Sequence, residues 1–61
     1  MLDTEKTYYQ EALPIFEKVR EMAPDEVKKW GLQLYSIYYK LNMSTELNKI
    51  ETVLKAEGML D

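Results

Sequence analysis

The sequence contains no cysteine and no histidine. Without cysteine there can be no disulfide framework, no zinc–thiolate site and no thiol nucleophile. Without histidine the chain lacks the most frequent general base and the most frequent transition-metal ligand. Its two glycines, Gly31 and Gly58, are far apart and form no phosphate-binding loop, and no serine has a plausible base beside it. We therefore expect no enzymatic activity, no cofactor and no metal.

Long apolar runs are also missing. No stretch approaches the roughly 20 apolar residues that a membrane-spanning helix needs, and residues 1–15 lack the basic start and apolar core of a signal peptide. With 61 residues, 46% of them hydrophobic and 31% charged, the composition is that of one small globular domain. A chain this short buries only about 60% of the surface that its unfolded form exposes, so a missing neighbour would affect its stability.

The charge is unevenly distributed along the chain. The net charge is −3, made up of −4 over residues 1–26, +3 over residues 27–45 and −2 over residues 46–61. An acidic chain of this kind disfavours nucleic acid and anionic membranes as partners. The basic middle leaves room for an acidic peptide ligand. The alternative is that Lys28 and Lys29 merely lie near acidic neighbours.

Apolar spacing predicts three helices, over about residues 4–22, 26–41 and 45–57, and there is no strand signal. The middle segment has apolar residues three, four and seven apart on one face and a second, mixed face, which is typical of a helix lying between two others. Short turns make neighbouring helices antiparallel. We therefore expect an all-α fold of three antiparallel helices. The apolar stripe of the middle helix comprises Trp30, Leu34, Ile37, Tyr38 and Leu41.

The outer helices carry one apolar stripe each, and Glu11, Lys18 and Glu21 should point outward from the first. The stripe of the first helix comprises Tyr9, Ala12, Leu13, Phe16, Val19, Arg20 and Ala23, with Met22 adding to the buried side at its end. The stripe of the third helix comprises Leu47, Ile50, Val53 and Leu54.

Residues at the helix ends predict how each helix starts and stops. Asn42 is suited to a left-handed helix stop and Gly58 ends the third helix. Pro14 should lie within a continuous first helix that bends there, at the loss of one hydrogen bond, and the alternative is a regular helix that starts near Gln10 with Pro14 close to its first turn. Gly31 indicates either close approach of another backbone or simple tolerance of glycine. The candidate capping residues are Asp3 or Thr4 for the first helix, Asp25 for the second, with Pro24 in its first turn as an alternative, and Ser44 or Thr45 for the third.

The spacing of these residues resembles a tetratricopeptide repeat over roughly residues 8–55. Trp30 is similar to the family's early tryptophan but lies one residue out of register, Tyr35 replaces a small residue, and Glu51 falls where an aromatic is expected. The mismatch at Glu51, in the last helix, is usual in a terminal repeat that caps the stack. The residues that match the second helix of a repeat are Tyr9, Ala12, Phe16, Val19, Met22 and Pro24, and those that match the first helix of the next are Leu34, Tyr38, Leu41 and Asn42.

The resemblance implies a C-terminal portion of a longer repeat protein, in which a partner helix for the first segment is missing or is replaced by self-association. It also implies that the middle helix lines a groove for an extended peptide or a partner helix. Ammonium groups around an apolar centre suit a carboxylate-bearing peptide. The groove residues would be Lys29, Leu32, Ser36, Tyr39 and Lys40.

Three hypotheses about the function remain. The first is a protein-interaction scaffold, with Tyr8, Tyr35 and Tyr39 as further contact candidates. The second is a purely structural capping or oligomerisation segment without a ligand. The third is a small helix-turn-helix regulator that binds DNA through the basic middle helix, which the buried apolar residues and acidic flanks disfavour. The acidic row Glu17, Glu21 and Asp25 is interpreted as a solvated face rather than a cation site.

Overall fold

The computed structural model describes residues 4–60 and contains three helices. These are α1 (Thr4–Met22), α2 (Val27–Lys40) and α3 (Ser44–Ala56), and residues 4–60 include no strand. The predicted ranges 4–22, 26–41 and 45–57 agree with these bounds to within one residue at every end. The expected all-α fold of three helices is therefore confirmed.

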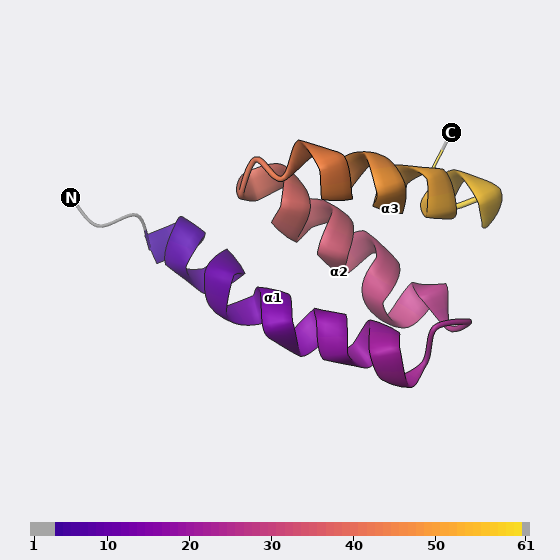
Figure 1. The fold of residues 1–61 in the computed structure, drawn as a ribbon, viewed down its shortest axis with the longest axis horizontal. Helices are drawn as coiled ribbons and strands as arrows, with labels where there is room; N and C mark the ends of the chain where they lie inside the picture. The colour runs from indigo at the N-terminus through magenta and orange to yellow at the C-terminus, as the bar shows by residue number, and fades with distance from the viewer. Residues whose placement is uncertain (1–3, 61) are drawn as a thin grey trace.

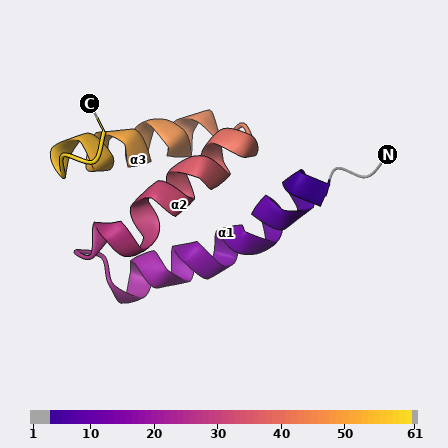
Figure 2. The same cartoon turned by 180° about the vertical axis from the view of Figure 1, so that it is seen from behind.

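The middle helix lies between the other two, as its two-faced pattern predicts. Figures 1 and 2 show α2 crossing between α1 and α3, with each helix running opposite to the one before it. Within residues 4–60 no Cα atom of α1 lies within 8 Å of a Cα atom of α3. The helices thus form one layer, with extents of 39 × 24 × 16 Å. Both outer helices depend on α2 for their buried contacts.

Most of the core comes from α2, whose buried Trp30, Leu34, Ile37 and Tyr38 form one cluster with Ala12 of α1. Because α2 packs on both α1 and α3, this cluster lies between the outer helices. From α3 the core receives Ile50 and Leu54. Seven further residues of the predicted stripes are half-buried and pack against this cluster, which confirms them as packing residues: Tyr9, Leu13, Phe16, Val19, Leu41, Leu47 and Val53.

The prediction for Met22 is wrong, because this side chain is 75% exposed. Met22 lies seven residues after Ile15, and residues seven apart share one helix face. That face of α1 points away from α2, so nothing in residues 4–60 covers it.

The turn from α1 to α2 is fixed by Trp30. Its indole Nε1 donates a hydrogen bond of 2.8 Å to the carbonyl oxygen of Ala23. The Arg20 guanidinium lies 5.1 Å from the centroid of the Trp30 ring, in a cation–π arrangement. The buried ring therefore joins the end of α1 to the start of α2, and Arg20 packs on this side of α1 as predicted.

Side-chain caps are absent at the starts of α2 and α3, where the sequence predicts them. The residues that precede α2 and α3 are Glu26 and Met43, and neither makes a capping hydrogen bond through its side chain. Asp25 lies one position too early to cap α2, and Ser44 is already the first residue of α3. Thr4 is the first described residue of α1, and Asp3 lies outside the described residues.

The helix stops follow the sequence. Asn42 has a φ of 57°, the left-handed conformation, and the Met43 N–H donates to the Tyr38 carbonyl at 2.9 Å. Gly58 has a φ of 73° at the end of α3, followed by the equivalent bond from Met59 N–H to the Leu54 carbonyl at 2.8 Å. Both are six-to-one Schellman closures, which satisfy carbonyls at the helix end.

Pro14 lies inside α1, which is continuous as predicted. Proline has no N–H, so the carbonyl of Gln10 loses its helical partner. Pro14 and Gln10 are both exposed, which allows water to take the place of that donor.

Gly31 is buried where α2 meets α3. A Cβ atom at this position would lie 2.7 Å from Cδ2 of Leu54 and 2.8 Å from Cγ1 of Val27. The group from α3 that approaches Gly31 is therefore a side chain, not a second backbone. The glycine leaves space that the fully buried Leu54 occupies.

Candidate functional site

The five residues predicted to line a groove are all exposed on α2. The first four are three or four residues apart and Lys40 directly follows Tyr39, which places them all on the side of the helix opposite the buried stripe. We call this surface the α2 face. It comprises Lys29, Leu32, Ser36, Tyr39 and Lys40.

The α2 face does not form one continuous groove. Lys29 and Lys40 are eleven residues apart, which corresponds to about 16 Å along a helix. Lys29 lies at the N-terminal end, where its ammonium group forms a 3.2 Å ion pair with Glu26. Leu32 lies between the two ends and lines none of the hollows described below. The two lysines therefore belong to separate sites.

At the C-terminal end, Ser36, Tyr39 and Lys40 line a hollow of about 330 Å³ together with Tyr9 of α1 and Tyr35. We call this the tyrosine hollow. It presents four hydroxyl groups, three aromatic rings and one ammonium group, and Tyr39 is 62% exposed. Such amphipathic rings are frequent at protein interfaces.

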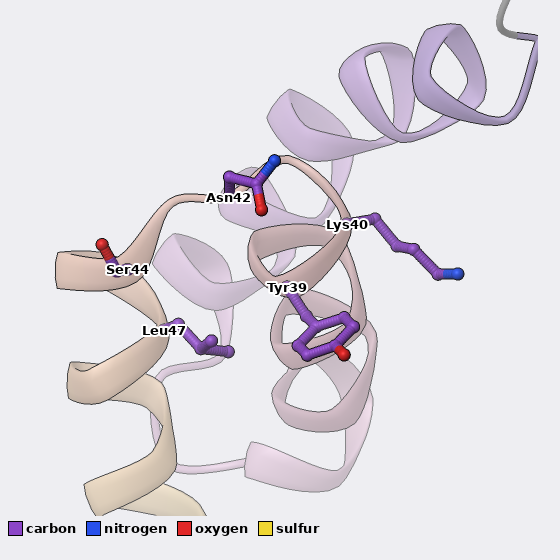
Figure 3. Close-up of a pocket in the computed structure, with 5 residues that line it drawn as sticks. All are labelled: Tyr39, Lys40, Asn42, Ser44 and Leu47. Carbon is purple, nitrogen blue, oxygen red and sulfur yellow. The ribbon is translucent and has the colours of Figure 1, made fainter.

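A second hollow, of about 450 Å³, lies on the other side of Tyr39, between the end of α2 and the start of α3. Its lining adds Asn42, Ser44 and Leu47 to Tyr39 and Lys40. Figure 3 shows the Tyr39 ring and the Lys40 chain extending from α2, while Leu47 points from α3 toward α2. Tyr39 and Lys40 thus stand on a ridge between two hollows.

Lys40 is already paired within the chain. Its ammonium group lies 2.8 Å from a carboxylate oxygen of Glu5 on α1. The hydrogen bond and negative charge of Glu5 raise the pKa of Lys40 above its ordinary value. Both side chains are largely exposed, and exposed ion pairs of this kind exchange partners at little cost. An incoming carboxylate could therefore replace Glu5.

The N-terminal end of α2 offers a different environment. A hollow of about 390 Å³ lies there, toward the end of α3. Lys28 and Lys29 share it with three acidic residues, so its local charge is not basic. This agrees with the alternative that these lysines lie near acidic neighbours. The hollow is lined by Asp25, Glu26, Val27, Lys28, Lys29, Glu57 and Met59.

Several residues of the C-terminal site were not predicted to belong to it. Tyr9 was expected to pack in the core, and it does so partly while one side of it lines the tyrosine hollow. Asn42 and Ser44 were interpreted only as helix-end residues. Tyr35, in contrast, was predicted to be a contact candidate, because the large ring and polar tip of tyrosine suit interfaces. The sequence could not predict that Tyr9 lines this hollow, because that depends on α1 packing beside Tyr35 and Tyr39 of α2.

The acidic row Glu17, Glu21 and Asp25 gathers no ligand set. Within residues 4–60 no group of three or more acidic residues is placed to hold a metal ion. Glu17 instead accepts a long hydrogen bond of 3.4 Å from the Tyr38 hydroxyl. Burial and the charge of Glu17 both raise the pKa of Tyr38 above 10.0, its ordinary value.

Within residues 4–60, none of the helices has both the length and the apolar composition that a membrane span requires.

Comparisons with protein-family models, with curated proteins and with solved structures found no match to this chain. The similarity to tetratricopeptide repeats therefore remains a prediction from the sequence, and the function is inferred from the geometry of the site.

Proposed function

We propose that this chain is a protein-interaction scaffold of the tetratricopeptide type, which binds an acidic peptide or a partner helix at the C-terminal end of the α2 face. The observation that carries the proposal is the position of Tyr39 and Lys40 on a ridge between two hollows. The ring of Tyr39 offers apolar area at little cost in side-chain entropy, and Lys40 offers a charge for a carboxylate.

Binding would proceed by exchange of one carboxylate for another. The ligand's acidic group would take the place of Glu5 beside the Lys40 ammonium group. A neighbouring side chain of the ligand would enter the tyrosine hollow, where the hydroxyls of Tyr9, Tyr35 and Ser36 provide donors and acceptors. The ligand's main contacts would lie at this end, because Lys29 lies at the other end of α2 and lines a different hollow, which it shares with three acidic residues.

The DNA-binding alternative is disfavoured by the position of α2. A recognition helix must insert into the major groove, which is about 12 Å wide, close to the diameter of a single helix with its side chains. Here α1 and α3 pack on both sides of α2, and Trp30, Leu34 and Ile37 are buried between them. An enzyme is disfavoured because the site has no nucleophile–base pair and no histidine.

The experiment begins with selection of peptides from a random display library on the folded chain. The tightest binder, labelled with a fluorophore, would be measured by anisotropy, and its site would be mapped by amide chemical shifts. We expect acidic residues in the selected peptides and shifts at Ser36, Tyr39 and Lys40. Steeply salt-dependent binding of a DNA duplex, measured in parallel, would instead favour the DNA alternative.

Charge variants separate the C-terminal site from general attraction to lysine. Lys40→Glu should weaken peptide binding about tenfold or more, because a charge-assisted hydrogen bond is lost. Glu5→Gln should tighten it, because the competing carboxylate is removed. Lys49→Glu on α3 makes the same charge change away from the site and serves as the matched control. Equal effects of Lys40→Glu and Lys49→Glu, or no gain from Glu5→Gln, would contradict the assignment.

A further inference from the structure

A second surface, on α1, is apolar and uncovered. Tyr8, Ile15 and Met22 recur every seven residues and are 63%, 61% and 75% exposed. Residues at this spacing form a nearly straight line along a helix. The line lies roughly a third of a turn from the side of α1 that packs on α2, as follows from 3.6 residues per turn. The peptide site on α2 does not use it.

Two charged residues complete this line. Glu11 and Lys18 fall between the apolar residues, so that positions 8, 11, 15, 18 and 22 follow the alternating three- and four-residue spacing of a coiled-coil seam. Both side chains are exposed, and neither forms an ion pair within residues 4–60. We call these five residues the α1 seam.

The α1 seam is complementary to itself when it is reversed. We infer that two copies of this chain associate through an antiparallel pairing of their α1 helices, with a two-fold axis at Ile15. In this arrangement Ile15 meets its own copy, and Tyr8 of each chain meets Met22 of the other, a favourable aromatic–sulfur contact. Glu11 of each chain lies next to Lys18 of the other, which forms two ion pairs flanking the axis.

The charges select this orientation. In a parallel pairing each Glu11 would face a second glutamate and each Lys18 a second lysine, and like charges across an interface are strongly unfavourable. In the antiparallel pairing the same residues attract at both positions. An isologous contact of this type closes as a dimer and does not propagate into a filament.

The length of the α1 seam limits how stable the proposed dimer can be. The 19 residues of α1 extend about 28 Å. A standard stable interface buries about 800 Å² from each partner, which would be about a sixth of the 4604 Å² exposed by this chain. A single helix pair supplies less than that, so we expect a dimer that dissociates on dilution rather than a permanent one.

The test is sedimentation equilibrium of the full chain over a concentration series. Wild type should shift from monomer to dimer as concentration rises. Ile15→Glu places two carboxylates on the two-fold axis and should leave only monomer. Leu32→Glu makes the same change at an exposed apolar residue of α2 and should leave the dimer intact. Thermal melts followed by circular dichroism would verify that both variants remain folded.

A charge exchange tests the orientation. Glu11→Lys and Lys18→Glu should each raise the dimer dissociation constant by about tenfold or more, because each creates like-charge contacts at two symmetric positions. The double variant E11K/K18E should restore the wild-type value. Wild type that stays monomeric at every concentration, a dimer that survives Ile15→Glu, or a double variant no better than the single ones would overturn the inference. These outcomes are independent of peptide binding at Tyr39 and Lys40.

Discussion

Replacing Gly31 with alanine tests how tightly α2 and α3 pack. Alanine is favoured over glycine inside a helix by about 1 kcal/mol. Its Cβ atom, however, would lie 2.7 Å from Cδ2 of Leu54, a side chain with no exposed surface into which it could move. Overpacking of this kind costs about 1–3 kcal/mol. We therefore expect Gly31→Ala to lower the free energy of unfolding by up to about 2 kcal/mol, despite the better helix former.

A double-mutant cycle isolates the contact. Leu54→Val removes the terminal methyl group that meets residue 31 and should cost about 1 kcal/mol on its own, roughly one buried methylene. In the double variant the alanine methyl would fill that space. The double variant should therefore lose about 1–2 kcal/mol less free energy of unfolding than the sum of the losses in the two single variants. Val27 is unchanged in all four proteins, so its own contact with position 31 largely cancels.

Urea denaturation followed by circular dichroism, with Trp30 fluorescence as a second probe, would measure all four proteins. A domain of 61 residues is expected to have about 3–9 kcal/mol of stability, so losses of this size leave a measurable folded baseline. Additive effects within about 0.5 kcal/mol, or a Gly31→Ala protein more stable than wild type, would refute the close packing of Leu54 on Gly31.

Two further predictions concern stability. The pKa of Tyr38 is raised by burial and by Glu17, so its contribution to stability is complete below about pH 10 and is lost as the pH rises through the folded pKa. Tyr38→Phe should leave the free energy of unfolding nearly unchanged at pH 7, since the 3.4 Å hydrogen bond to Glu17 is long. Above pH 10, urea titrations should show a smaller loss of stability for this variant than for wild type. An equal loss in the two proteins would contradict the prediction. Asn42→Ala should lower the melting temperature by the equivalent of about 1 kcal/mol because of the left-handed φ of 57°, whereas Asn42→Gly should leave it unchanged or higher; equal melting temperatures for the two variants would contradict the strain.

The three helices and their stops could be predicted from the residues alone. Apolar residues three and four apart define the faces of α1, α2 and α3, because the helical period is a local property of the chain. Asn42 and Gly58 end their helices because few other residues adopt a left-handed conformation cheaply. The two-faced pattern of α2 also indicated an inner helix, since a helix with apolar residues on two sides needs neighbours on both.

The contacts of the exposed residues could not be predicted in this way, because they depend on how the three helices pack. Lys40 pairs with Glu5 and Tyr9 lines the hollow beside Tyr39 because α1 returns alongside α2, which joins residues about thirty positions apart. The resemblance to tetratricopeptide repeats placed Lys29 and Lys40 in one groove, whereas in the structure they line different hollows at opposite ends of α2. Met22 was predicted to add to the buried side at the end of the first helix, but it is exposed. Whether such a residue is covered depends on where the neighbouring helix lies, and α2 leaves that side of α1 open.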